Sequence, residues 1–211
     1  MPIDKKFLDQ FIHVTSKAAL ASSFQVGKKD KIAADKAAVD SMRTELNNMN
    51  INGKIVIGEG ELDEAPMLYI GEKVGTLTGP ELDIAVDPLE GTNFAANNLP
   101  GALSVIAISE KNNLFSAPET YMEKISTKVK EKNIVDLDFS IKKNITNLSD
   151  YLNKKPENLT ACILDRPRHN SIIEELKKLN VKIKYISDGD VSGALLVTED
   201  KYNVDIYLGI G

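Results

Sequence analysis

Two segments near the amino end place hydrophobic residues every three to four positions, which is the repeat of an amphipathic helix. Residues 4–24 predict the first helix and residues 33–48 the second, with Asp30 as the expected N-cap of the second. The predicted buried positions are Phe7, Phe11, Val14 and Ala18 in the first helix and Ala34, Ala38, Met42 and Leu46 in the second. Each helix therefore has one face to bury against another layer of the fold.

Short apolar and β-branched runs follow these helices, and such runs predict strands. The predicted strands cover residues 54–57, 82–86 and 102–109, with a strand or edge segment at 119–126. Residues 136–152 are predicted to be mainly helical.

From residue 158 the pattern changes to a regular alternation of strand and helix. The predicted order is strand 160–164, helix 170–179, strand 181–186, helix 191–197 and strand 204–208. This alternation is typical of parallel βαβ units. We therefore expect an α/β protein with a boundary near the Lys155-Pro156 turn: an amino-terminal α+β domain at 1–155 and a βαβ domain at 156–211.

The composition excludes some classes of function. The chain has 211 residues, 42% hydrophobic and 27% charged, with a formal net charge of −5. These values are ordinary for a soluble globular protein and give no general attraction to nucleic acid or anionic membranes. The single cysteine, Cys162, lies in an apolar run and is expected to be buried rather than nucleophilic. No secretory leader and no segment of transmembrane length is recognisable, so we expect a cytoplasmic protein.

One predicted strand leads into a turn with two carboxylates and a hydroxyl. Asp87 and Glu90 flank a proline that is expected to stop the strand, and Gly91-Thr92 is placed to open a helix. Carboxylates at the start of a helix suit Mg²⁺ or Mn²⁺, and the helix N-terminus favours a phosphate. The alternative is an acidic strand-to-helix turn with a structural cap only.

A second acidic loop, Gly58-Glu59-Gly60-Glu61-Leu62-Asp63-Glu64, follows the predicted strand at 54–57. By itself it fits a solvated loop. However, crowded carboxylates disfavour the folded state unless a cation neutralises them, and a second acidic turn on a neighbouring strand favours a metal site. Asp35, in the first turns of the second helix, and Asp63 each allow a structural and a metal-binding interpretation.

Polar turns follow the three strands of the βαβ part: Arg166-Pro167-Arg168-His169, Asp188-Gly189-Asp190 and Leu208-Gly209-Ile210-Gly211. The carboxyl ends of parallel strands share one sheet edge, which is where open α/β sheets bind ligands. Arginine forks suit an anion, and aspartates accept hydrogen bonds from sugar hydroxyls. Taken singly, each turn also fits a surface turn without a ligand.

Together these segments resemble the class II fructose-1,6-bisphosphatases, the GlpX family of the lithium-sensitive sugar-phosphatase superfamily. The segments that carry the resemblance are residues 30–35, 55–69, 83–92, 117–118, 121–124, 166–169, 188–190 and 209–211, in family order. The resemblance implies a layered fold of the fructose-1,6-bisphosphatase/inositol monophosphatase type.

The resemblance also implies roles for individual residues. The implied ligands of Mn²⁺ or Mg²⁺ are Asp35, Glu59, Asp87 and Glu90. The implied substrate contacts are Lys31, Glu90, Gly91, Thr92, Tyr121, Arg166, Pro167, Arg168, Asp188, Gly189 and Asp190. The implied catalytic positions are Asp63, Thr92 and Glu59. Thr92 would orient the attacking water near Glu59 or Asp63, and the arginines and Tyr121 would hold the distal phosphate.

The implied reaction is hydrolysis of the 1-phosphate of fructose 1,6-bisphosphate to fructose 6-phosphate, a step of gluconeogenesis. Sedoheptulose 1,7-bisphosphate is an alternative substrate, and a non-catalytic remnant that binds metal or sugar phosphate is an alternative function. The expected partner is a small sugar bisphosphate, with neither nucleic acid nor membrane. Whether the chain forms a homo-oligomer stays open.

Three features depart from the family pattern. Arg166 stands where lysine is frequent, and residues 93–100 match poorly. The family's Gly-Ala-Pro-Glu-Gly continuation, which carries a fifth metal ligand, has no counterpart after Gly211. We therefore expect a second domain truncated at its carboxyl end and weak or absent activity from these 211 residues.

Overall fold

The structure is a computed structural model that describes residues 5–59, 67–116 and 120–211. It divides the chain into two compact units, Met1–Pro118 (unit 1) and Glu119–Gly211 (unit 2). The division falls before the predicted boundary at residue 155, because segments upstream of that residue pack in unit 2. Strand β5 (Glu123–Ser126) pairs with β8 (Ile206–Ile210), and α4 (Ile141–Leu152) contributes to the unit 2 core.

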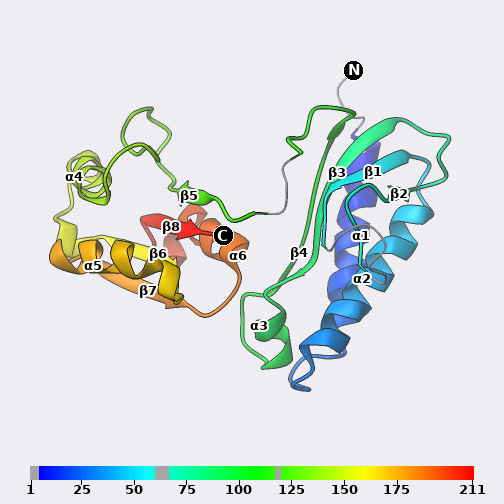
Figure 1. Cartoon of the computed structure of the whole chain (residues 1–211), viewed down its shortest axis with the longest axis horizontal. Helices are drawn as coiled ribbons and strands as arrows, with labels where there is room; N and C mark the ends of the chain where they lie inside the picture. The colour runs from blue at the N-terminus through cyan, green and yellow to red at the C-terminus, as the bar shows by residue number, and fades with distance from the viewer. Residues whose placement is uncertain (1–4, 60–66, 117–119) are drawn as a thin grey trace. The chain divides into compact units, whose positions relative to one another are not determined.

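Unit 1 is a four-stranded sheet packed against two long helices (Figure 1). The strand order is β2-β1-β3-β4; β1 and β3 are parallel, and β2 and β4 are antiparallel to their neighbours. The elements of unit 1 are α1 (Lys6–Ser23), α2 (Lys31–Asn47), β1 (Asn52–Ile57), β2 (Lys73–Val74), β3 (Glu81–Glu90), α3 (Thr92–Ala96) and β4 (Leu103–Glu110).

The helical pattern of the sequence explains how α1 and α2 pack. All eight predicted positions are buried, and they belong to one core that includes the apolar residues of β1 and β3. Asp30 is the N-cap of α2 as predicted, since its side chain accepts a hydrogen bond from the Ala33 amide at 2.9 Å. The α2 helix therefore begins at a defined residue, which matters for the placement of Asp35 in its second turn.

Strand β3 is longer than predicted. Proline was expected to end the strand after Val86, yet β3 continues through Pro88 to Glu90. The register to β4 shifts between Asp87 and Glu90, so Pro88 lies in an irregular part of the ladder where its missing N–H is tolerated. Asp87 and Glu90 are therefore both part of the strand.

Unit 2 is a second four-stranded sheet, with the order β5-β8-β6-β7. Strand β6 (Thr160–Leu164) is parallel to β7 (Lys182–Ile186) and to β8, which confirms the predicted parallel βαβ arrangement, and β5 is an antiparallel edge strand. The remaining helical elements are η1 (Pro156–Asn158), η2 (Pro167–His169), α5 (Asn170–Lys178), α6 (Asp190–Leu195), η3 (Leu196–Thr198) and η4 (Asp200–Tyr202).

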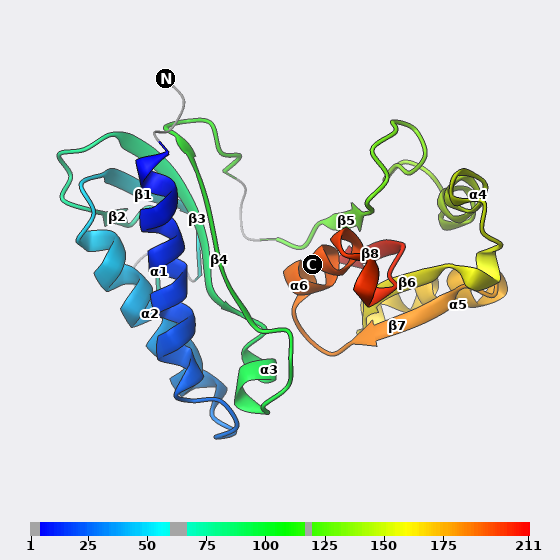
Figure 2. The ribbon, with the colours of Figure 1, turned by 180° about the vertical axis from the view of Figure 1, so that it is seen from behind.

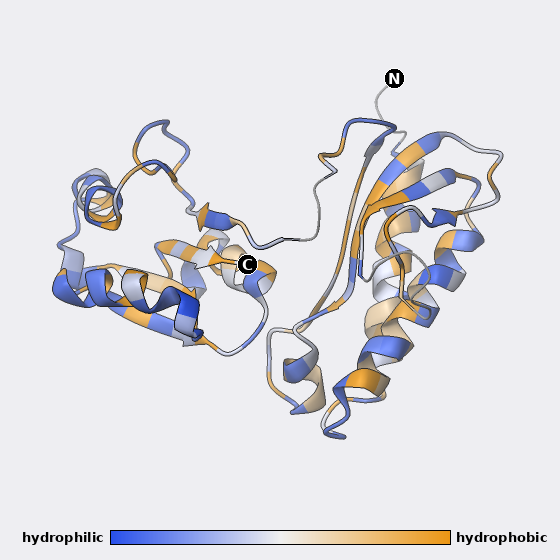
Figure 3. Cartoon of the chain, viewed as in Figure 1, coloured by the Kyte–Doolittle hydropathy of each residue, from blue (hydrophilic) through white to orange (hydrophobic). Residues whose placement is uncertain are grey.

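Helices cover both faces of this sheet. Alternating residues of β6 and β8 face two separate cores, one shared with α4 and α5 and the other with α6 and η3. Figure 2 shows α5 running alongside β6 and β7. The hydropathy colouring in Figure 3 marks most of α5 as hydrophilic, which agrees with its two buried residues, Ile173 and Leu176.

Two element boundaries in unit 2 differ from the prediction for the same reason. Residues 136–140 are not helical: the Asn144 side chain accepts from the Asp136 amide and donates to the Asp136 carbonyl, both at 2.9 Å, which holds a turn before α4. Strand β8 begins at Ile206 rather than Val204, and Asp205 just before it is a hydrogen-bond acceptor for several elements. Polar side chains compete with helix and ladder hydrogen bonds at both places.

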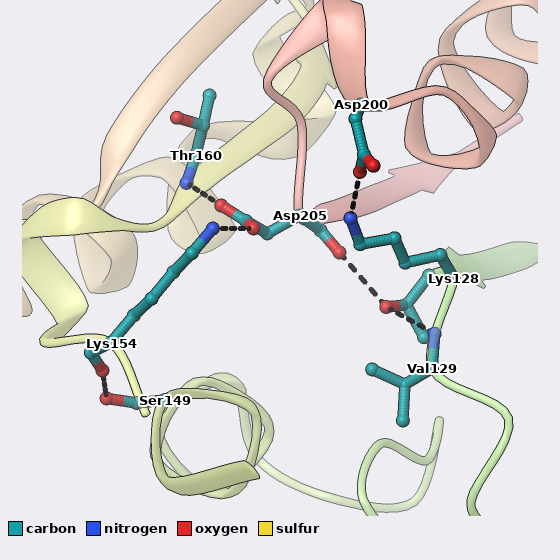
Figure 4. A network of polar contacts seen from close by, with 8 residues as sticks. Lys128, Val129, Ser149, Lys154, Thr160, Asp200 and Asp205 are labelled. Carbon is teal, nitrogen blue, oxygen red and sulfur yellow. Dashed lines mark hydrogen bonds and ion pairs between the residues drawn. The ribbon is translucent and has the colours of Figure 1, made fainter. Parts of the chain in front are cut away.

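Asp205 is the centre of a polar network at the amino ends of β6 and β8 (Figure 4). Its carboxylate accepts from the Thr160 amide at 2.9 Å and from Lys154 Nζ at 2.7 Å, and its carbonyl accepts from the Thr127 hydroxyl at 3.0 Å. Lys128 forms an ion pair with Asp200 beside it. This Asp205 network joins β5, α4, β6 and β8 at the edge opposite the carboxyl ends of the parallel strands.

Among the described residues, no helix is both long enough and apolar enough to span a membrane.

Candidate functional site

The candidate metal ligands of unit 1 lie at one edge of its sheet. Strands β1 and β3 are parallel neighbours, so the end of β1 that leads to Glu59 lies beside the end of β3 that carries Asp87 and Glu90. The Glu59 amide donates to the Leu68 carbonyl at 3.0 Å, and a Cβ on Gly58 would lie only 2.2 Å from that same carbonyl oxygen. Glycine at 58 is therefore required for Glu59 to occupy this edge.

The turn after β3 opens a short helix, as the sequence predicted. Gly91 has φ 79°, and a Cβ there would lie 2.8 Å from the Phe94 ring, so both its conformation and its surroundings favour glycine. Thr92 is the first residue of α3, directly after Gly91, and Glu90 is 8% exposed directly before it. The three residues thus stand together at the end of the strand.

Backbone hydrogen bonds bring the start of α2 to the same end of the sheet. The Gly27 amide donates to the Ala95 carbonyl at 3.0 Å, and the Lys29 amide donates to the Ala96 carbonyl at 2.9 Å. These bonds tie the loop before α2 to α3, and Asp35 follows one turn into α2. Lys31, the first residue of α2, is exposed.

Electrostatics show that four carboxylates of unit 1 influence one another. The pKa of Asp87 is raised to about 8, first by burial and then by the charges of Glu59, Glu90 and Asp35. Burial also raises the pKa of Asp35. One oxygen of Asp35 and one of Asp87 are buried without a hydrogen-bond partner in the described part of the chain. The edge therefore gathers acidic groups, and the ionised form of Asp87 is disfavoured there.

This donor set fits a hard divalent cation in its chemistry, because carboxylate oxygens are the ligands that Mg²⁺ and Mn²⁺ prefer. Within residues 5–59, 67–116 and 120–211, however, no three histidine, cysteine or acidic side chains form a group that could hold a metal ion as the structure stands. The acids of this edge therefore supply suitable ligand chemistry, but the described residues do not form a complete ligand set. Asp63, the remaining acidic candidate, lies outside the described residues.

In unit 2, the two arginines at the end of β6 differ in what they contact. Arg166 uses both terminal nitrogens on backbone carbonyls, those of Asp165 at 3.0 Å and Ser187 at 2.7 Å, and lies 3.9 Å from the Asp188 carboxylate. Arg166 thus braces the β7–α6 turn, whose Gly189 has φ 73°. Pro167, between the arginines, is exposed.

Arg168 presents its guanidinium differently. Its Nε donates to the Ile210 carbonyl at 2.6 Å, and its Cζ lies 4.5 Å from the centre of the Tyr121 ring, a cation–π contact. Within the described residues, neither terminal nitrogen of Arg168 has a hydrogen-bond partner. Both terminal nitrogens of Arg168 are therefore available as donors, and the Tyr121 side chain beside them is 68% exposed.

Two further residues at this edge were not predicted from the sequence. Lys124 donates to Asp190 at 3.1 Å and to the Gly211 carbonyl, so one candidate sugar contact is an ion-pair partner. His169 is fully buried and bonds the Leu164 carbonyl and the Ile210 backbone. The sequence features that could have pointed to them are the position of Lys124 in a segment that carried the family resemblance and the position of His169 directly after Arg168.

Known proteins resemble the chain over nearly its whole length. The family model for bacterial fructose-1,6-bisphosphatase, glpX-encoded, matches residues 5–211. The chain is 45% identical to a D-fructose 1,6-bisphosphatase class 2/sedoheptulose 1,7-bisphosphatase of Thermosynechococcus vestitus, over 96% of the chain and 62% of the relative. It is 46% identical to fructose-1,6-bisphosphatase 1 class 2 of Escherichia coli K12, over 96% of the chain and 60% of the relative. The chain thus spans about three fifths of the length of these relatives.

A solved structure supports the fold. CysQ from Bacteroides thetaiotaomicron, a bacterial member of the inositol monophosphatase family, superimposes with a TM-score of 0.50 at 16% identity, covering 97% of this chain and 80% of CysQ. At this identity the likeness concerns the fold alone. It confirms the predicted α/β fold of the inositol monophosphatase type.

Proposed function

Since the chain belongs to the family of bacterial, glpX-encoded fructose-1,6-bisphosphatases, we propose that it takes part in the metal-dependent hydrolysis of the 1-phosphate of fructose 1,6-bisphosphate. Phosphatases of this family are metal-dependent in general. The proposed metal is Mn²⁺, with Mg²⁺ as the alternative, because both are hard cations suited to carboxylate oxygens.

One observation carries the proposal: the pKa of Asp87, near the end of β3, is raised to about 8, first by desolvation of its carboxyl group and then by the charges of Glu59, Glu90 and Asp35. Three further acids around one desolvated carboxyl group are costly for the fold unless a cation joins them. A phosphatase has a use for that arrangement, since the cation it attracts also attracts phosphate.

The residues have distinct proposed roles. Asp35, Glu59, Asp87 and Glu90 are the metal ligands, and a bound divalent cation neutralises phosphoryl oxygens and lowers the pKa of a coordinated water. The Thr92 hydroxyl orients the attacking water, and Glu59 or Asp63 accepts its proton. Lys31, exposed at the start of α2, attracts the anionic substrate.

Unit 2 is proposed to recognise the sugar phosphate. Arg168 donates its two terminal nitrogens to the distal phosphate, and Tyr121 holds the guanidinium plane. Asp188 and Asp190 accept hydrogen bonds from sugar hydroxyls, and Arg166 keeps the turn that carries them in place. Holding the distal phosphate fixes the orientation of the rest of the substrate.

A second substrate has a specific observation in its favour. The Thermosynechococcus vestitus relative carries both fructose 1,6-bisphosphatase and sedoheptulose 1,7-bisphosphatase in its name. Both sugars present two phosphates and a run of hydroxyls, so the same Arg168 and aspartate contacts suit either one. We keep sedoheptulose 1,7-bisphosphate as the alternative substrate.

Metal binding is the first test, because it depends on residues that this chain contains. Calorimetric titration of the chain with Mn²⁺ is expected to show binding that Asp87→Asn weakens at least about tenfold. Release of inorganic phosphate is then measured with each bisphosphate and Mn²⁺, and any release is expected to fall in the same variant. A chain that binds no Mn²⁺, or binds it equally well after Asp87→Asn, would contradict the proposed site.

A further inference from the structure

The carboxyl end of β8 is held on its β6 side by a histidine rather than by a backbone ladder. Strands β6 and β8 pair only at Ala161↔Ile206 and Cys162↔Tyr207. On its other side β8 stays paired to β5 as far as Glu123↔Ile210. The last residues of β8 therefore need another partner toward β6, and the side chain of His169 supplies it.

The hydrogen bonds of His169 determine its tautomer. Nδ1 lies 2.7 Å from the Leu164 carbonyl oxygen, which only accepts, so Nδ1 carries the proton. With the proton on Nδ1, Nε2 accepts a hydrogen bond from the Ile210 amide at 2.9 Å, and it also lies 3.2 Å from the Ile210 carbonyl oxygen. The ring is fully buried, so both bonds are shielded from water. His169 thereby joins the end of β6 to the end of β8.

Arg168 depends on the same residue of β8. While the Ile210 amide donates to His169, the Ile210 carbonyl accepts from Arg168 Nε at 2.6 Å. The Tyr121 ring lies against the guanidinium, and the neighbouring Met122 exchanges two backbone hydrogen bonds with Gly211, each 3.1 Å long. If Ile210 were displaced, Arg168 would lose its Nε hydrogen bond, and the Tyr121–Met122 segment that packs against the guanidinium would shift with it.

We propose that His169 is a positioning residue for phosphate recognition: by fixing the Ile210 backbone, it aims the two terminal nitrogens of Arg168 at the phosphate of a sugar-phosphate ligand. The identity of the ligand rests on the proposed function, whereas the link from His169 through Ile210 to Arg168 does not. His169 itself contacts no ligand in this proposal.

The link is tested first without any ligand. His169→Phe keeps a ring of similar size and removes both hydrogen bonds. Hydrogen exchange of the Ile210 amide is expected to become at least about tenfold faster, and the Arg168 Nε–H signal in a ¹⁵N-correlated NMR spectrum is expected to broaden or shift toward that of a solvent-exposed arginine. If both signals stay as in the wild type, the proposal is wrong, whether or not the protein binds sugar phosphates.

The effect on recognition is tested with inorganic phosphate and fructose 6-phosphate as probes. His169→Phe is expected to weaken their binding about tenfold, and to have no further effect in an Arg168→Ala background, because the histidine acts through the arginine. Asp205→Asn is the matched control: it breaks buried hydrogen bonds at the opposite edge of the same sheet and is expected to leave both affinities unchanged. If His169→Phe and Asp205→Asn lower the affinity for the probes equally, His169 only stabilises the fold and the proposal is wrong.

Two milder variants separate positioning from stability even if His169→Phe folds poorly. Glutamine places an amide at the position of Nε2 and keeps an acceptor for the Ile210 amide, whereas asparagine places its amide at the position of Nδ1 and keeps only the bond to Leu164. His169→Gln is therefore expected to bind phosphate more tightly than His169→Asn. Equal affinities would contradict the proposal. A wild-type chain that binds neither probe would contradict the proposed function, while the ligand-free NMR result still decides the link.

Discussion

Two aspartates, one in each unit, have opposite surroundings. Asp205 in unit 2 accepts hydrogen bonds from an amide and an ammonium group, and it joins four elements of the fold (Figure 4). Asp87 in unit 1 is surrounded by Glu59, Glu90 and Asp35, and one of its oxygens lacks a partner among the described residues. The difference separates a carboxylate whose hydrogen-bond partners are built into the fold from a carboxyl group whose ionised form the fold disfavours.

The largest expected effect is a difference in sign between two matched Asp→Asn substitutions. Asp205→Asn is expected to lower the free energy of unfolding of unit 2 by about 2 kcal/mol, because an amide cannot accept from both the Thr160 amide and Lys154. Asp87→Asn in chelator at pH 8 is expected to raise that of unit 1 by about 1 kcal/mol, because it removes a buried like charge. Urea unfolding followed by residue-resolved NMR measures the free energy of unfolding of each unit. If both substitutions lower it by similar amounts, the two aspartates do not differ in the way described.

A divalent cation is expected to offset the repulsion among the acids of unit 1 and so to stabilise that unit. At 100 times its dissociation constant, Mn²⁺ is expected to stabilise the unit that contains Asp87 by about 2.7 kcal/mol and to leave unit 2 unchanged. Hydrogen exchange with and without the ion reports each unit separately. The Asp205→Asn variant should keep the full response and Asp87→Asn should lose it; stabilisation of both units alike would point to non-specific binding.

The pH dependence of unit 1 in chelator is expected to follow the pKa of Asp87. That pKa is raised from an ordinary value of 3.8 to about 8, so between these pH values the folded state holds more protons than the unfolded state. The free energy of unfolding of unit 1 therefore has its full contribution from protonated Asp87 below about pH 4, and it loses that contribution as the pH rises toward 8. Denaturant titrations of wild type and Asp87→Asn at several pH values measure the difference, and a wild-type slope no steeper than that of the variant would be evidence against this titration.

Cys162 is buried in unit 2 and forms no hydrogen bond or ion pair with Asp87 or Asp205 in the described part of the chain, so it is expected to stay unreactive in the folded protein. Burial raises the pKa of its thiol to about 11, so little thiolate is present at pH 8. Ellman's reagent should react at least about 100-fold more slowly with the folded protein than with the protein in urea. Rapid reaction of the native thiol would reveal an exposed nucleophile that the structure does not place there.

Much of the fold could be predicted because its signals are local. The buried stripes of α1 and α2, the Asp30 cap and the strand–helix alternation of unit 2 each depend on residues within a few positions of one another. The prediction was wrong at Pro88, where an irregular register lets the strand continue, and at the boundary between the units, where β5 pairs with a strand far along the chain. Pairing over long sequence distances leaves no short-range pattern.

By itself, the sequence determined the residue types at the strand ends: acids after β1 and in the last residues of β3, and arginines and aspartates after β6 and β7. Only the tertiary structure decided which of these groups share a neighbourhood. Asp35 approaches the end of β3 because the loop before α2 forms hydrogen bonds with α3. The terminal nitrogens of Arg166 donate to backbone carbonyls, whereas those of Arg168 do not within the described residues. The reason is physical. Each position of the sequence specifies its own side chain, but the desolvation, the local charge and the hydrogen-bond partners of that side chain depend on which residues the fold places beside it.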